Sequence, residues 1–340
     1  MMRRALLAAA MVATIPSVLA LPKLTRRDEC TSTKTQRKPW SMLTDDEKSA
    51  YIDAELCLMS APSQSGVEGA ESRWDDLQHN HIIQTQVVHD VGQFLPWHRY
   101  HVTVHAELLQ DECGYTGSIP YWDETVDAEL SDLSTADVFQ ADAFGGDGDG
   151  DNNCITTGPF ANLTLHLRRL GVDPSDYCLS RSLNLAQLQQ ASQSNLDKCM
   201  AIDNYTSAWE CWHSSPHNAG HGGTGGVMVD VVLNFSQSNV LIMSLFSTWL
   251  DAQWWRWQSA DLDNRLTDMG GRNVPEDSYI QQGNLPEPTA AWTDYFGDDG
   301  NVTTLNHVLY ASEIRPNVTV GDVMDVGGST ICSEYVYSDE

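Results

Sequence analysis

The 340-residue sequence predicts a mainly α-helical protein, and two kinds of observation support that prediction. First, Thr44 with Glu47 and Ser72 with Asp75 have the spacing of capping boxes, in which a hydroxyl and an acid together cap the first turn of a helix. Second, the segment 240–258 is apolar nearly all round, as expected for a helix that is buried on every side. We therefore expect helices to form the core.

The first predicted helix begins at Thr44 and continues through YIDAELCLM, whose apolar spacing gives one buried face. A loop at 66–70 separates it from the helix that begins after Ser72. From residue 126 to residue 153, Asp, Ala, Gly and Ser dominate, which predicts a solvated loop. The DGDGDNN segment within it lacks the Gly and the Glu that a calcium-binding loop has at its sixth and twelfth positions, so we do not interpret it as a calcium site.

Three histidines, His81, His89 and His98, stand in the segment HIIQTQVVHDVGQFLPWHRY. Nine residues at about 100° each amount to half a turn, so His89 and His98 cannot share a face of one unbroken helix. Gly92 and Pro96 predict a break after His89 and a new helix with Pro96 in its first turn. Two helices that meet at an angle can point three imidazoles at one metal ion. Three His ligands leave a fourth position open, as in catalytic metal sites.

A second candidate segment is PHNAGHGGTGGVMVD, where His217 and His221 are four residues apart and point the same way on a helical turn. No Lys-Ser/Thr follows the glycines, which excludes a phosphate-binding loop. Asp251 is the single acid of the apolar helix at 240–258, and a buried acid needs a partner. Two interpretations stay open: a hydrogen bond to a metal-bound His, or an ion pair with Arg256 or Arg265.

The N-terminal residues 1–20 have the pattern of a secretory signal peptide, with an Arg pair, a short apolar run and small residues. Residues 21–27 end in Arg-Arg and form a candidate pro-segment, which leaves 28–340 as a single domain. All eight cysteines follow the signal without any metal-finger spacing, so we expect disulfides, with the pairing open. Five sequons predict a secreted, glycosylated surface, at Asn162, Asn204, Asn234, Asn301 and Asn317.

The formal net charge of -28 gives a surface that repels nucleic acid and anionic membranes. We therefore expect neither of these partners, and nothing in the sequence predicts a protein partner.

The segment SRWDDLQHNHIIQTQVVHDVGQFLPWHRY, followed by DECGYTGSIPYWD, resembles the first metal-binding half of the short secreted fungal tyrosinases and catechol oxidases. PHNAGHGGTGGVMVD and LDAQWWRWQ resemble the second half. The resemblance covers nearly all of the mature chain. It implies a four-helix bundle that supplies three histidines to each of two adjacent copper ions. The first set would be His81, His89 and His98, and His217 and His221 would belong to the second.

The sixth ligand of that pattern is missing. In these oxidases a His-His pair precedes the Asp of a D-x-x-W-W motif, and its second His binds copper; here Phe246 and Ser247 stand at those positions. No other His lies between His221 and His307. A dinuclear copper centre binds O₂ by taking one electron from each copper, and two imidazoles with a hard hydroxyl such as Ser247 hold copper poorly. The complete first set, with one open position, suits zinc as a Lewis acid.

This departure is similar to that of the cyclopenases, zinc-containing relatives that convert a cyclopenin-type benzodiazepinedione into a viridicatin-type quinolone with loss of methyl isocyanate. By this resemblance we expect a zinc-dependent lyase of fungal alkaloid biosynthesis that acts on a small aromatic substrate. His217, His221 or His101 would move the proton. One alternative is a copper-dependent oxidase of phenols, catechols or o-aminophenols, in which Ser247, His101 or water completes the second site. The other is a non-catalytic metal-binding scaffold.

Overall fold

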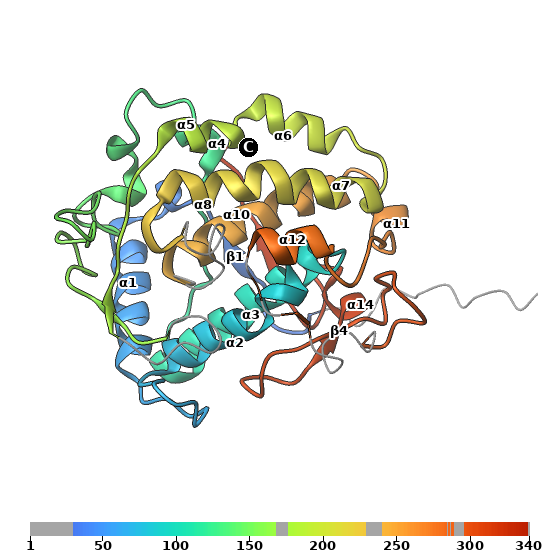
Figure 1. Cartoon of the computed structure of the whole chain (residues 1–340), viewed down its shortest axis with the longest axis horizontal. Coiled ribbons are helices and arrows are strands. Elements are labelled where there is room, and N and C mark those ends of the chain that lie inside the picture. The colour runs from blue at the N-terminus through green and yellow to red at the C-terminus, as the bar shows by residue number, and fades with distance from the viewer. Residues whose placement is uncertain are drawn as a thin grey trace, which may run out of the picture.

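The computed structural model shows a helical core surrounded by loops and short strands (Figure 1). The predicted signal peptide, the candidate pro-segment and Asn234 lie outside the described residues. No helix among the described residues is long and apolar enough to cross a membrane. The structure describes residues 30–167, 176–228, 240–283, 285, 287–288 and 296–338.

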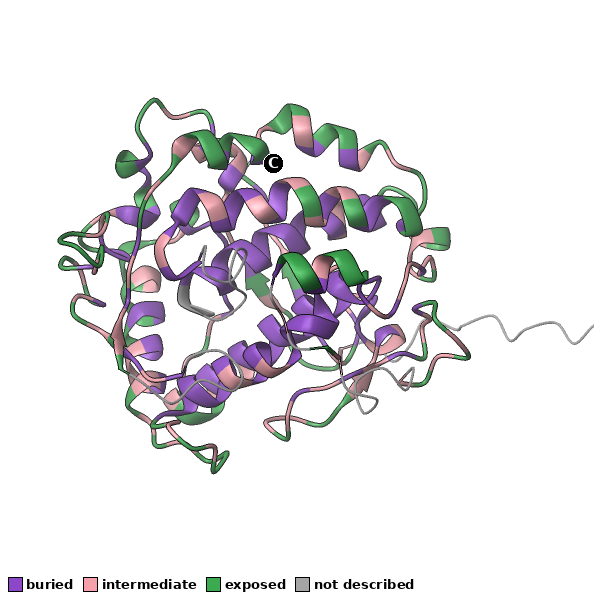
Figure 2. Cartoon of the chain, in the orientation of Figure 1, coloured by how far each residue is buried: buried purple, intermediate pink, exposed green. Residues whose placement is uncertain are grey.

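Four helical stretches form the centre of the molecule, and their residues are mostly buried (Figure 2). Helix α3 packs against α1, α2 and α10, and α10 also contacts the η5 turn that precedes α8. This arrangement confirms the prediction of a mainly helical fold. The four central stretches are α2 (Arg73–Val88), α3 (Phe94–Cys113), the continuous stretch α7 (Tyr205–Trp212), η5 (His213–His217) and α8 (Asn218–Thr224), and α10 (Val240–Ser259). Helix α1 (Asp45–Ser60) lies beside them.

Local sequence signals set the ends of the central helices. Both predicted capping boxes are present, at Thr44 and at Ser72. Helix α2 ends at Val88 because His89 has an extended backbone with φ -120° and ψ 154°. Helix α3 then begins two residues before Pro96. The predicted break between the two helices is therefore confirmed.

The remaining elements are short and lie around this core. Three two-stranded sheets are present among the described residues, and the parallel pair of β1 and β6 joins the beginning of the described chain to its end. The elements are β1 (Thr35–Arg37), η1 (Trp40–Met42), α4 (Glu124–Asp127), η2 (Leu133–Thr135), η3 (Asp137–Phe139), β2 (Thr164–Leu165), β3 (Tyr177–Cys178), α5 (Leu185–Leu188), η4 (Gln189–Ala191), α6 (Gln193–Met200), η6 (Gly226–Met228), α11 (Leu262–Arg265), α12 (Asp277–Gln282), β4 (Val308–Leu309), β5 (Val318–Thr319), α14 (Val320–Val323) and β6 (Ser333–Tyr335).

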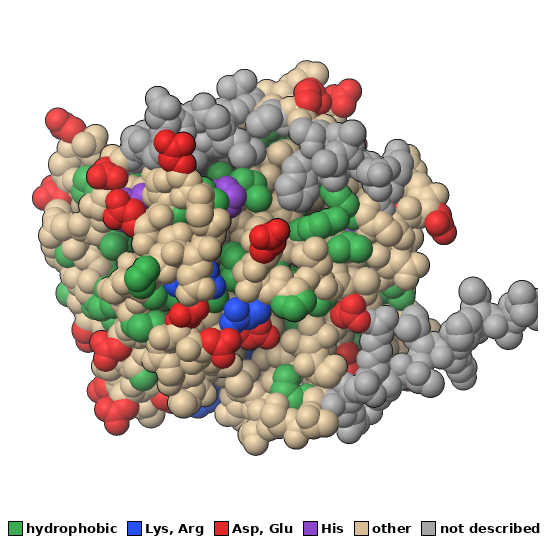
Figure 3. Space-filling view, turned by 90° about the horizontal axis from the view of Figure 1, so that it is seen from below, with side chains coloured by type: hydrophobic (Ala, Val, Ile, Leu, Met, Phe, Trp, Pro, Cys, Tyr) green, Lys and Arg blue, Asp and Glu red, His purple; other side chains and the backbone are tan. Residues whose placement is uncertain are grey.

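All eight cysteines form disulfides, which confirms their predicted structural role. The face shown in Figure 3 carries scattered Asp and Glu side chains with few Lys or Arg, in agreement with the net charge of -28. Of the predicted solvated loop at 126–153, the DGDGDNN segment at 147–153 is mostly exposed. The part before it differs from the prediction, because it contains the short helices η2 and η3 and buries Leu133, Phe139 and Phe144 in the core. The four bridges are Cys30–Cys332, Cys57–Cys113, Cys154–Cys178 and Cys199–Cys211.

Candidate metal centre

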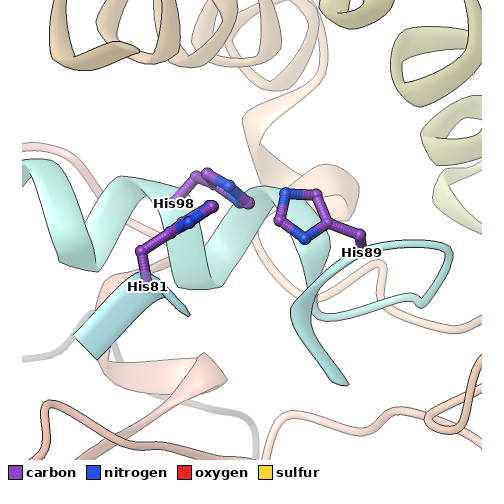
Figure 4. A group of neighbouring side chains, drawn as sticks. All are labelled: His81, His89 and His98. Atoms are coloured by element: carbon purple, nitrogen blue, oxygen red, sulfur yellow. The ribbon is translucent and has the colours of Figure 1, made fainter. Parts of the chain in front are cut away.

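The three histidines of the first segment converge on one point. His81 lies on α2, His89 follows the last residue of that helix, and His98 lies on α3. Their rings face one another (Figure 4), and one ring nitrogen of each lies within 4.8 Å of the other two. All three are buried. The extended backbone at His89 turns its ring toward the other two, as the predicted break required.

Hydrogen bonds to the backbone fix the orientation of two of these rings. The Nδ1–H of His89 donates to the Thr85 carbonyl at 2.9 Å, and the Nδ1–H of His98 donates to the Phe94 carbonyl at 2.7 Å. This tautomer leaves a lone pair on each Nε2. The Nε2 of His89 is buried without a hydrogen-bond partner. An imidazole that binds a metal ion through Nε2 needs a lone pair on that atom. The three residues therefore fit a divalent metal ion that keeps one open coordination position.

Burial also keeps these imidazoles neutral. Desolvation lowers the pKa of His89 to about 4. It is also the main cause that lowers the pKa of His81 and of His98 well below the usual value, with the neighbouring imidazoles as a further cause. At neutral pH the three rings therefore present lone pairs rather than charges, as metal binding requires.

The second pair, His217 and His221, is joined by a hydrogen bond between the two Nε2 atoms at 3.2 Å. The Nδ1–H of His221 donates to the Met228 carbonyl at 2.9 Å, so in the neutral ring Nε2 is the acceptor. His217 must then donate from Nε2, which leaves its Nδ1 bare. That atom is buried and has no hydrogen-bond partner. Burial lowers the pKa of His221 to about 3, so this pair is also neutral.

The two sets of histidines are neighbours. The ring centroid of His217 lies 5.7 Å from that of His89 and 6.1 Å from that of His98. The structure therefore brings together all five histidines that the sequence singled out as metal ligands. The five are His89, His98 and His217, whose rings are neighbours, together with His81 of the first triad and His221 of the second pair.

The second pair has no third ligand among the described residues, where only the first triad brings three ligating groups together. The apolar ring of Phe246 faces the pair, with its centroid 4.7 Å from His221 and 5.7 Å from His217. The hydroxyl of Ser247 is buried and has no hydrogen-bond partner. These residues do not fit a second copper ion held by three imidazoles.

Sequence reasoning missed His213, which precedes His217 by four residues and could have been found by that spacing. Its ring stacks on His217 at 5.2 Å with an interplanar angle of 19°, and it contacts Phe94 edge-on at 5.0 Å. The lone pairs of an imidazole lie in the ring plane, so two nearly parallel rings do not converge on one metal ion. His213 packs against the second pair and does not complete it.

His101 lies beside the first triad. Its ring stacks on Trp97 at 4.8 Å, and its centroid is 6.0 Å from that of His81. Its Nδ1 accepts a hydrogen bond from the Asn80 amide at 3.2 Å. Desolvation lowers the pKa of His101 to about 3, with His105 as a further cause. His101 is therefore a neutral neighbour of the candidate metal site.

Both interpretations of Asp251 are wrong. Its two oxygens accept from the guanidinium groups of Arg99 at 2.5 Å and Arg37 at 3.1 Å, and these three groups are buried. Neither Arg256 nor Arg265 is its partner, and no metal-site histidine bonds to it. The Tyr335 hydroxyl also donates to Oδ2 at 2.5 Å, so this buried acid is fully hydrogen-bonded. Asp251 therefore links β1, α3, α10 and β6 instead of orienting an imidazole.

A helical core with a buried set of neutral imidazoles defines a metal-binding helical protein. The model of the common central domain of tyrosinase matches residues 71–260, and the chain belongs to this family.

Two relatives and one solved structure are similar to this chain over most of its length. The tyrosinase-like protein phomQ1 of Diaporthe leptostromiformis is 28% identical over 327 residues, which cover 89% of this chain and 78% of that protein. The N-acetyl-6-hydroxytryptophan oxidase ivoB of Emericella nidulans is 25% identical over 356 residues, with 88% and 91% covered. A polyphenol oxidase of Thermothelomyces thermophila is 26% identical, with a TM-score of 0.73 and 91% of each chain covered. These matches confirm the predicted fold and family.

Proposed function

We propose that this chain is a one-metal enzyme of fungal secondary metabolism, a zinc-dependent lyase of the cyclopenase type. The observation that carries the proposal is the asymmetry of the centre. His81, His89 and His98 form a complete three-imidazole set. The His217–His221 pair has Phe246 against it where a third ligand would be needed.

The proposed reaction converts a cyclopenin-type benzodiazepinedione into a viridicatin-type quinolone and methyl isocyanate. The two products together contain every atom of the substrate, so no oxidant or reductant is required. Zinc held by the first triad would supply Lewis acidity toward a substrate oxygen. One such ion suffices for this chemistry, and O₂ activation by a copper pair does not enter it.

The protein groups that would move the proton lie beside the triad. His217 has a bare Nδ1, and its Nε2–H is held by His221, so a proton accepted at Nδ1 would give a cation stabilised by that hydrogen bond. His101 is a second proton carrier, on the α3 side of the triad. The third candidate is Ser247 on α10, which has a buried hydroxyl and follows Phe246. The apolar ring of Phe246 packs against the His217–His221 pair.

The test is the metal content of the full chain purified from a secretory host without added metal. We expect about one zinc per chain and little copper, together with turnover of cyclopenin without O₂ consumption. His81→Ala should lose both the zinc and the turnover. Two coppers per chain would contradict the proposal.

The second candidate is a copper oxidase of phenols or o-aminophenols, which the relatives' names favour, since one is an oxidase of a hydroxyindole and others are tyrosinases. Metal content distinguishes the two functions. If the first proposal is correct, the wild-type chain holds one metal ion and Ser247→His should hold a second. If the wild-type chain already holds two coppers and consumes O₂ with a catechol, the chain is a copper oxidase. A non-catalytic scaffold would bind metal and turn over neither substrate.

A further inference from the structure

A groove lies on the surface between the β4–β5 loop, residues 310–317, and helix α2. Its volume is about 790 Å³. The apolar side chains of Ile83, Ile314 and Pro316 form part of its lining, and Glu313 and Arg315 add charged groups. This combination of apolar surface with polar groups at the edges suits a sugar, which has apolar C–H faces and a rim of hydroxyls.

Asn317 lines the same groove and begins the sequon Asn317-Val318-Thr319. Its side chain is exposed, and its Oδ1 accepts from the backbone N–H of Ala311 at 3.1 Å. An N-linked glycan attaches to Nδ2 and leaves Oδ1 available. Glycosylation therefore keeps this hydrogen bond, and the attached sugar starts in the wall of the groove.

We propose that the groove holds the first N-acetylglucosamine of a glycan on Asn317. Attachment through the chain's own Asn317 makes the binding intramolecular, so weak contacts suffice. Arg315 is held in the lining of the groove, because its guanidinium donates to Glu107 at 2.8 Å and to Asp111 at 2.6 Å. The second N–H of its Nη2 and of its Nη1 can donate to a sugar hydroxyl.

The backbone of the β4–β5 loop is strained, so a bound sugar would stabilise it. Ser312 and Glu313 are consecutive non-glycine residues with φ of 47° and 64°, a left-handed conformation that such residues adopt at a cost in free energy. The hydroxyl of Ser312 donates to Asn80 at 2.6 Å, and Asn80 donates to His101. The sugar would therefore hold a strained loop that is bonded to the margin of the metal centre.

The experiment uses the full chain from a eukaryotic secretory host and measures hydrogen exchange of residues 310–317. The intact glycoprotein is compared with protein trimmed to a single N-acetylglucosamine by endoglycosidase H and with protein from which the glycan is removed by peptide N-glycosidase. We expect the trimmed form to exchange as slowly as the intact form, and the deglycosylated form to exchange about tenfold faster in this loop.

Variants separate the sugar from the side chain. Asn317→Asp removes the sequon but keeps an oxygen acceptor for Ala311, and it should match the deglycosylated form. Thr319→Ser keeps the sequon and the cap of α14, and Asn301→Asp removes a different exposed sequon; both should leave this loop unchanged. An unmodified Asn317, or equal exchange in the trimmed and deglycosylated forms, would overturn the proposal.

Discussion

The turn that carries His89 is held by an ion pair, and its removal should weaken metal binding. Asp90, the next residue, has a left-handed φ of 58° without being glycine. Its Oδ1 accepts from the Nη2 of Arg272 at 2.6 Å, and its carbonyl accepts from the Nε of the same residue at 2.9 Å. The backbone N–H of Glu276 donates to its Oδ2 at 2.9 Å. We therefore expect Arg272→Met to loosen the backbone that positions His89.

The expected loss of metal affinity is estimated from the two hydrogen bonds that the Arg272 guanidinium donates to Asp90 at a partly exposed site. Hydrogen bonds to charged groups contribute about 1.5–3 kcal/mol each when buried. The side chain of Arg272 is 28% exposed and that of Asp90 is 15% exposed, so solvent screening reduces the contribution. We expect a total loss of about 1–2 kcal/mol, which corresponds to a roughly 5- to 30-fold weaker metal affinity.

The assay is zinc competition against a chromophoric chelator, with circular dichroism to show that each variant is folded. Glu210→Gln is the matched control, because it removes an exposed partner of the same guanidinium, at 3.0 Å, without touching Asp90. The control should change the affinity less than about twofold. If Arg272→Met keeps wild-type affinity, or if Glu210→Gln weakens binding equally, the ion pair does not position His89.

Three further predictions concern stability. A Cβ on Gly92 would lie 2.1 Å from a backbone oxygen of the facing turn, so Gly92→Ala should cost roughly 2–4 kcal/mol in urea unfolding, while Gly300→Ala, with open space around it, should cost under about 1 kcal/mol. Replacing both Cys57 and Cys113 by Ser removes the bridge across 56 residues and should cost about 2–5 kcal/mol; an unchanged midpoint would contradict this. Burial raises the pKa of Glu124 well above 4.5, so its folded form favours the protonated acid. The wild type should therefore lose stability as pH rises above 4.5, and the stability of Glu124→Gln relative to the wild type should increase with pH over the same range; a gain independent of pH would refute the assignment.

The parts of the centre that the sequence predicts are those that depend on local signals. The capping hydroxyl of Ser72 starts α2, and Gly92 and Pro96 separate it from the next helix, so the convergence of the first three histidines follows from short-range rules. The four-residue spacing of His217 and His221 is also a short-range signal, and it predicts that their side chains point the same way on one helical turn.

The parts that it does not predict depend on contacts between distant segments. The arginine partners of Asp251 are Arg99 and Arg37, which are 152 and 214 residues away, and the nearby arginines of its own helix and the next are not involved. His213 had a visible spacing, but whether it stacks or ligates depends on its ring plane against His217, which no sequence pattern reports.

The hydrogen bonds that orient the first triad come from its own two helices, and this explains how a chain can keep one complete site while lacking a ligand of the other. The rings of His89 and His98 are oriented by carbonyls within one turn of their own positions, and the turn between them is held by Arg272. Helix α10 packs Phe246 against the second pair, and no described hydrogen bond links it to the first triad. Phe246 and Ser247 in place of an imidazole pair on α10 therefore leave these orienting hydrogen bonds in place.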